Sequence, residues 1–253
     1  SGLKYSDDDS DAAWLAKLLR LGLLPEGYIY PREERAVRDL LRRRSRLVQQ
    51  HTANVLAVQN LLSRNRGHAL SGNEIKRLTP EKVNALLPDA NLALAVQSTL
   101  LAMRGQEAAI DLLEREACAQ VRCQPAYRHL LTTSGIGQVL GLTILLETGP
   151  IERFAHVGNY ASYSRCVGSE RLSNGKRKGR GNTKSGNKYL AWAYLEAANF
   201  AVRYNPRIKR YYQRKRAKTN GVVAIKTVAH KLARACYHML REGSDFDVER
   251  AFA

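Results

Sequence analysis

The sequence predicts a mostly α-helical protein, and three observations support this class. Apolar residues recur at helical spacing along much of the chain, in steps of three, four and seven residues. Glycine, proline and capping residues interrupt these stretches where helices would begin or end. Strand patterns are scarce, although residues 165–184 are compatible with a β-hairpin.

Length and charge indicate a globular protein that binds a polyanion. The chain has 253 residues, 44% of them hydrophobic, and a formal net charge of +18. A basic surface attracts phosphate groups and releases their counterions, so nucleic acid is the first partner to consider. An anionic membrane surface is the alternative, but no basic amphipathic segment stands out and no apolar run approaches the ~20 residues of a membrane span. We therefore expect no membrane association.

The cysteines and the first residues of the chain do not indicate a particular reaction or metal site. The four cysteines and six histidines have no metal-binding spacing such as paired CxxC motifs. We expect reduced thiols in a cytoplasmic protein, and no signal peptide is visible. The chain begins with Ser1-Gly2 rather than with Met, which suggests a processing scar or the edge of a longer protein.

The first predicted helix follows an acidic cluster and ends near Gly22 and Pro25. Acidic residues at a helix start suit the helix dipole and can cap the helix. Asp8 and Asp11 are three residues apart, so they can share one face and bind a hard cation such as Mg²⁺. Capping and solvation of the two carboxylates is the alternative.

Two long helices are predicted next, over residues 31–65 and 90–122, with a polar loop or small subdomain at 67–79. In the first helix, Arg44 and His51 occupy one seam position, so the pattern is not a clean zipper. Two long helices in tandem suggest an antiparallel hairpin that could also dimerise. The apolar positions that predict them are Leu41, Val48, Val55 and Leu62, then Leu92, Val96, Met103, Ile110 and Leu113.

The chain changes character at Pro125. Two short apolar helices flank Ser134-Gly135-Ile136-Gly137, which is the pattern of a helix–hairpin–helix. Gly135 and Gly137 can adopt positive φ and let backbone N–H groups approach a phosphate. An ordinary corner between two core helices is the alternative.

A basic, glycine-rich segment follows at residues 165–188, after a short predicted helix at 154–163. Such a stretch cannot build a core, so it is either a solvated loop or a loop that becomes ordered on nucleic acid. Ser173 lies inside it, where cations could stabilise the charge of a phosphate under attack. A solvated basic loop without chemistry is the alternative for Ser173. The basic residues are Arg165, Arg171, Lys176, Arg177, Lys178, Arg180, Lys184 and Lys188.

The last part of the chain is predicted to be helical, over residues 189–198, 207–218 and 222–241. Tyr189, Tyr204, Tyr211 and Tyr212 are interleaved with basic residues there. Such aromatic rings can stack on unpaired bases, or they can pack the helices together.

Three stretches make the chain similar to the Piv-type DEDD transposases and invertases, the insertion-sequence recombinases that include bridge-RNA-guided enzymes. Asp8-Asp9-Ser10-Asp11-Ala12 is similar to the closing D-x-x-D-A motif of that family. The Ser134–Gly137 hairpin resembles the start of its transposase domain. Residues 160–198, with Ser173-Asn174-Gly175-Lys176 and Lys184-Ser185-Gly186-Asn187-Lys188, resemble its catalytic block.

The resemblance implies a fold and an activity. Residues 1–28 would be the C-terminal end of a RuvC-like domain, 29–124 a coiled-coil dimerisation region, and 125–253 a transposase domain with the helix–hairpin–helix. Asp8 and Asp11 would be two ligands of catalytic Mg²⁺, and Ser173 would be the nucleophile that attacks DNA. A dimer or tetramer would act on DNA in a prokaryotic, nucleoid-associated setting, with a structured guide RNA. The nucleic-acid contacts would be Gly135, Gly137, Arg171, Lys176, Arg177, Lys178, Arg180, Lys184 and Lys188.

The chain departs from the family pattern at the metal site. The family supplies an Asp and a Glu upstream of the D-x-x-D-A motif, and this sequence begins only a few residues before Asp8. We therefore expect a truncated chain that is inactive alone. The alternatives are a non-catalytic DNA- or RNA-binding fragment, and a coiled-coil assembly protein with a basic tail.

Overall fold

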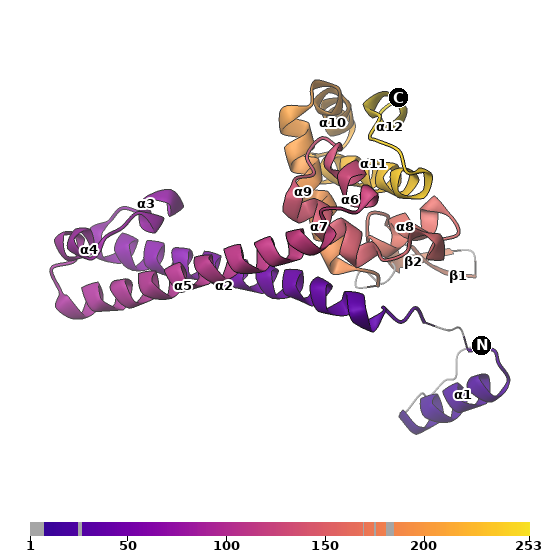
Figure 1. Cartoon of the computed structure of the whole chain (residues 1–253), viewed down its shortest axis with the longest axis horizontal. Helices are drawn as coiled ribbons and strands as arrows, with labels where there is room; N and C mark the ends of the chain where they lie inside the picture. Colours follow the sequence, from indigo (N-terminus) through magenta and orange to yellow (C-terminus); the bar gives the residue numbers. More distant parts are fainter. Residues whose placement is uncertain (1–7, 25–26, 169, 175, 181–184) are drawn as a thin grey trace. The chain divides into compact units, whose positions relative to one another are not determined.

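The computed structural model describes residues 8–24, 27–168, 170–174, 176–180 and 185–253, and it is mostly helical (Figure 1). The chain divides into two compact units, Ser1–Arg32 and Glu33–Ala253. The predicted mostly α class is thereby confirmed. In the described part of the chain, no helix combines the length and the apolar character needed to cross a bilayer.

The first unit contains helix α1 (Asp8–Arg20). Its first turn is acidic and its last turn contains Lys17 and Arg20, so both ends suit the helix dipole. None of its residues is buried, and Trp14, Leu15 and Leu19 are exposed.

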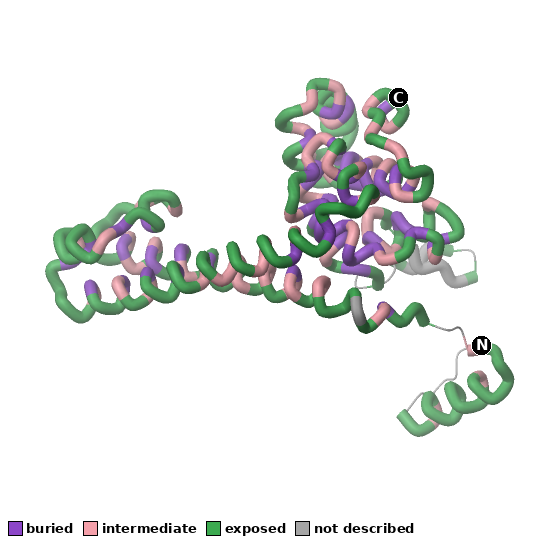
Figure 2. The backbone as a smooth tube through the Cα atoms, viewed as in Figure 1, coloured by how far each residue is buried: buried purple, intermediate pink, exposed green. Residues whose placement is uncertain are grey.

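Helices α2 (Arg32–Arg66) and α5 (Ala90–Val121) form the predicted antiparallel hairpin in the second unit. Val55, Val58 and Leu62 pack against Val96 and Leu100 in one apolar cluster. The buried positions lie along one side of each helix, and the remaining surface is exposed (Figure 2).

The polar seam residues of α2 have partners on α5. The Arg44 guanidinium donates to the Glu114 carboxylate at 2.6 Å. His51, which is buried, places Nε2 3.0 Å from a Glu107 oxygen. These pairs explain why the heptad pattern of α2 is interrupted, because the polar residues hold the register of the two antiparallel helices.

The residues between the long helices contain two short helices, α3 (Gly72–Lys76) and α4 (Pro80–Leu86), where the sequence indicated only a polar loop or small subdomain. Ser71 and Glu74 form a reciprocal capping box at the start of α3. Ile75 and Val83 are fully buried against the hairpin, so this segment is a small packed tip.

The remaining elements form a helical domain around α9 and α11. The face of α9 toward α7 and α11 is rich in alanine, and Ala193, Ala197 and Ala201 are fully buried, which lets the neighbouring helices approach closely. This is where buried residues concentrate in Figure 2. The elements are α6 (Pro125–Leu131), α7 (Gln138–Thr148), η1 (Ile151–Arg153), α8 (Val157–Tyr163), β1 (Glu170–Ser173), β2 (Lys176–Arg180), α9 (Lys188–Tyr204), α10 (Pro206–Lys218), α11 (Gly221–Glu242) and α12 (Val248–Ala251).

A buried chain of hydroxyl groups lies inside this core. The Tyr160 hydroxyl is 2.9 Å from Thr148 Oγ1 and 2.6 Å from the Tyr194 hydroxyl. Burial raises the pKa of both tyrosines well above the ordinary value. Burial also raises the pKa of Cys236 to about 12, so this thiol is protonated at neutral pH. All four cysteines are free.

Candidate nucleic-acid interface

The predicted β-hairpin is present, and it contains most of the basic segment. β1 and β2 pair antiparallel, with Ser173 opposite Lys176 and Glu170 opposite Arg180. Asn174 adopts a left-handed conformation at the turn, with φ +50°. The register shifts between Arg171 and Leu172, which gives β2 one extra residue.

The candidate nucleophile therefore has a defined place in the backbone, at the end of β1 beside the turn. Lys176 is exposed at the start of β2. The side chains of Arg171, Ser173, Arg177, Lys178 and Arg180 lie outside the described part of the structure, and so does the whole of residue Lys184. Ser173 as nucleophile, and these cations as nucleic-acid contacts, stay predictions.

The base of the basic segment is held together where its two ends meet. The Arg165 guanidinium donates to the Gly186 carbonyl at 2.8 and 3.0 Å. The Asn187 backbone N–H donates to the Tyr163 carbonyl at 2.6 Å. Gly186 has φ +90°, and a Cβ there would lie 2.5 Å from the same carbonyl oxygen. Only glycine allows this approach, so the two ends of the basic segment lie side by side at Arg165 and Gly186.

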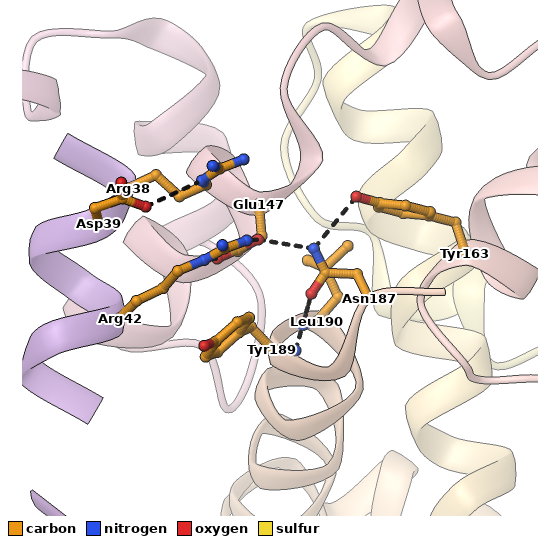
Figure 3. Close-up of polar contacts among 8 residues, drawn as sticks. All are labelled: Arg38, Asp39, Arg42, Glu147, Tyr163, Asn187, Tyr189 and Leu190. Atoms are coloured by element: carbon orange, nitrogen blue, oxygen red, sulfur yellow. Dashed lines mark hydrogen bonds and ion pairs between the residues drawn. The ribbon is translucent and has the colours of Figure 1, made fainter. Parts of the chain in front are cut away.

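A buried polar network fixes the return point to two other elements (Figure 3). Asn187 caps α9, and its side-chain oxygen accepts from the Tyr189 and Leu190 backbone N–H groups. Its side-chain nitrogen donates to Glu147 of α7 at 2.7 Å. Glu147 is only 4% exposed and receives two hydrogen bonds from Arg42 of α2, at 2.7 and 2.8 Å.

The charge of Glu147 is therefore matched inside the domain. The hydrogen bonds to Glu147 raise the pKa of Arg42 above its ordinary value, so the guanidinium stays charged. Arg42 also lies over the Tyr189 ring, 4.7 Å from the centroid, and Lys188 lies 5.2 Å from the same ring. Lys188, a predicted nucleic-acid contact, is exposed beside this network.

The sequence analysis did not single out Arg42, Glu147 or Asn187 as site residues. A glutamate in the otherwise apolar helix α7 was the available signal, because an ionised carboxylate in a core needs a partner. Its partner lies 105 residues away in α2, and periodicity cannot show such a contact.

The turn between α6 and α7 has two glycines in different environments. Gly135 has φ +92°, and a Cβ there would lie 2.3 Å from the Ala197 carbonyl oxygen of α9. Gly137 begins α7 and has open space in the place of a Cβ. Gly135 therefore allows the turn to pack closely on α9. The sequence alone did not distinguish this packing role from phosphate binding. Phosphate contact at either glycine stays a prediction.

Asp8 and Asp11 lie in the first turn of α1 and are exposed. They belong to the first unit, whereas the hairpin belongs to the second. Among the described residues, no group of three or more His, Cys, Asp or Glu side chains could hold a metal ion. Two exposed carboxylates do not by themselves make a Mg²⁺ site, so Asp8 and Asp11 as metal ligands stay a prediction.

Replacing Arg42 by alanine is expected to lower the free energy of unfolding by about 2–3 kcal/mol, because Glu147 then stays buried without its cation. The cost falls toward the lower end of the range for buried pairs, since the Arg42 side chain is 33% exposed. Urea unfolding measures the change, and hydrogen exchange at the Tyr189 and Leu190 amides should accelerate. Arg43→Ala, an exposed neighbour, is the control. Equal stability of the two variants would contradict the role of the network.

The comparisons with known proteins fall on this part of the chain. Residues 127–213 match the sequence model of the Transposase IS116/IS110/IS902 family. The match covers α6 to most of α10, and it includes the hairpin, Glu147 and Asn187.

A curated relative points the same way. A protein of Pseudomonas aeruginosa described as "Probable family 20 transposase" is 26% identical over 178 residues, which are 68% of this chain and 52% of that protein. The chain thus spans about half the length of this relative. Both similarities are to proteins described as transposases.

Proposed function

We propose that this chain is part of a DNA transposase or site-specific recombinase that cleaves and rejoins DNA strands. One observation carries the proposal: the matched residues 127–213 contain the basic hairpin and the Glu147–Asn187 contact at its base. The same proposal assigns residues 1–28 to the end of a RuvC-like domain, 29–124 to a dimerisation region and 125–253 to the transposase domain.

The proposed reaction uses Ser173 as nucleophile. The Ser173 hydroxyl oxygen attacks a backbone phosphorus and forms a phosphoserine ester. The P–O bond to the leaving strand breaks, the serine proton passes to a base or to water, and the departing oxygen is protonated. The cations of β1 and β2 would stabilise the added negative charge, and a transferred strand would reverse the attack.

Mg²⁺ and the two aspartates are a separate proposal. Asp8 and Asp11 would supply two carboxylates to a metal site, and a bound Mg²⁺ would stabilise charge on phosphate oxygens. The exposure of both side chains makes them accessible to a ligand. Alanine at both positions should remove any Mg²⁺-dependent cleavage while leaving the helical domain folded.

A structured guide RNA and a dimer or tetramer complete the proposal. The basic surface accommodates RNA as well as DNA, and helices α2 and α5 leave Leu56, Leu94 and Leu101 exposed. Nuclease digestion and sequencing of nucleic acid that copurifies with the chain tests the guide. One RNA of defined sequence supports it, and heterogeneous fragments contradict it.

A non-catalytic DNA- or RNA-binding fragment is the second candidate. It is favoured by the absence of a three-ligand acidic cluster among the described residues. Formation of a covalent protein–DNA adduct separates the two candidates, because a binding module cannot form one.

Joint replacement of Lys176, Arg177 and Lys178 by glutamine is expected to weaken DNA binding and to flatten its salt dependence. The slope of log affinity against log salt should fall by up to about 0.9 for each lost phosphate contact. Fluorescence anisotropy with labelled duplex DNA between about 50 and 200 mM salt measures it. An unchanged slope would mean that the hairpin does not touch phosphate.

A further inference from the structure

A second cationic feature lies on helices α10 and α11, apart from the hairpin. A cavity of about 370 Å³ opens between α11 and residues 244–251, and Tyr211 of α10 also lines it. Figure 1 draws α10 and α12 at the opposite end of the helical domain from β1 and β2. The proposed chemistry of Ser173 does not use this cavity.

The acidic residues in the cavity wall already have partners. Asp245 accepts from His129 at 2.7 Å, and Asp247 caps α12 by accepting from two backbone N–H groups. Arg250 is likewise paired with Glu242, at 2.8 and 3.0 Å. Asp245, Asp247 and Arg250 therefore each have a partner other than Lys231 and Arg234.

Those cations are Lys231 and Arg234, one helical turn apart on α11. The Lys231 ammonium donates to the Ala251 carbonyl at 2.9 Å and lies 5.1 Å from the Tyr211 ring centroid. Arg234 is exposed and has no hydrogen bond or ion pair with any residue that the structure describes.

Burial and the neighbouring positive charges lower the pKa values of two basic groups in the cavity wall. Burial, with the charges of Arg234 and Lys215, lowers the pKa of Lys231. Burial and the neighbouring Arg234 and Lys231 also lower the pKa of His230. Like charges held close together cost free energy, and an anion bound beside Lys231 and Arg234 would reduce that cost.

The surroundings favour a polyanion over a single small anion. Helix α10 contains no acidic residue, and a second hollow beside the cavity is lined by Arg210 and Arg214. A chain of phosphate groups could occupy the cavity and continue along α10, which a free phosphate cannot do. The cations of α10 are Arg207, Lys209, Arg210, Arg214, Lys215, Arg216 and Lys218.

We propose that Lys231 and Arg234 bind a backbone phosphate of a nucleic acid at a contact separate from the β1–β2 hairpin. The protein would then hold nucleic acid at two places on the helical domain. This goes beyond the proposed function, because it requires neither strand cleavage nor the hairpin.

The test compares three further variants with the wild-type chain and the Lys176, Arg177 and Lys178 variant in the salt titration with labelled duplex DNA. Lys231→Gln with Arg234→Gln removes the contact with one phosphate and should lower the slope of log affinity against log salt by roughly 0.9, and Arg234→Gln alone by up to about that amount. Lys76→Gln with Arg77→Gln removes the same charge from exposed positions at the end of α3, between the long helices α2 and α5. This control variant should keep the wild-type slope. Thermal unfolding checks that Lys231→Gln, which loses its bond to Ala251, is folded. If the variant that contains Lys231→Gln is not folded, the slope measured with Arg234→Gln alone decides the test.

Each outcome decides between the two proposals. Wild-type slopes in both cavity variants overturn the second contact, whatever the hairpin variant does. A reduced slope in the cavity variants, with a wild-type slope in the hairpin variant, supports the second contact and removes the hairpin from DNA binding. If inorganic phosphate binds in the cavity while the cavity variants keep the wild-type slope with duplex DNA, the cavity is a small-anion site only. The proposal would then be wrong.

Discussion

Gly135→Ala is expected to destabilise the helical domain by on the order of 3 kcal/mol or more. The added Cβ would lie 2.3 Å from the Ala197 carbonyl oxygen and 2.6 Å from the Ala201 backbone nitrogen. Both atoms belong to the backbone of α9, so relief requires that the helix itself moves. The residue also has φ +92°, which strains any L-amino acid with a side chain. Urea unfolding followed by circular dichroism measures the loss.

Gly137→Ala is the matched control in the same turn. No atom lies within 4 Å of the Cβ position there, and φ is −92°. We expect a change within about 1 kcal/mol, because the main cost is a poorer N-cap for α7. If the two variants unfold at the same urea concentration, the close approach of Gly135 to α9 is not what stabilises the turn.

Ser173→Ala is expected to abolish strand cleavage, by on the order of 10⁴-fold or more, while DNA affinity stays unchanged. Alanine removes the oxygen that would form the phosphoserine ester and leaves the basic residues of the hairpin in place. Denaturing electrophoresis of protein incubated with labelled DNA measures the covalent adduct. The salt titration measures affinity on the same preparation.

Ser185→Ala controls for the loss of any hydroxyl from the basic segment, since Ser185 is exposed and lies close to the return point of the loop. It should form the adduct at the wild-type rate. An adduct that persists in Ser173→Ala but disappears in Ser185→Ala would transfer the nucleophile role to Ser185. An adduct in neither variant nor the wild type would favour the binding-fragment candidate.

The helical fold could be predicted well from the sequence because helix periodicity is local. The seven-residue spacing of Leu41, Val48, Val55 and Leu62 indicated α2, and the helix predicted over residues 207–218 corresponds to α10. The short helices α3, α4 and α12 were not predicted. Each has seven residues or fewer, so periodicity has no room to appear, and packing of residues such as Ile75 holds them in place.

The candidate site was only partly predictable. The basic hairpin follows from composition and its turn dipeptide, and residues 165–184 do contain β1 and β2. The partners of Glu147 were not predictable, because Arg42 and Asn187 come from distant parts of the chain and meet it only in the folded domain. In the same way, the sequence shows Arg44 and His51 only as interruptions of the heptad pattern. Their partners Glu114 and Glu107 lie on α5 and become apparent only in the folded hairpin of α2 and α5.

The Arg42–Glu147 pair has a mechanical consequence. Arg42 lies on a helix of 35 residues, and Glu147 is bonded to the asparagine at which the basic segment rejoins the domain. The side chains of Arg42, Glu147 and Asn187 therefore link the long helix to the base of the basic segment. A partner bound to the exposed face of α2 would rotate this helix about its own axis. That rotation would displace the Arg42 guanidinium and, through Glu147, the Asn187 side chain at the base of the basic segment. A displacement of α2 relative to the start of α9 would therefore require the bonds of Glu147 to Arg42 or to Asn187 to break.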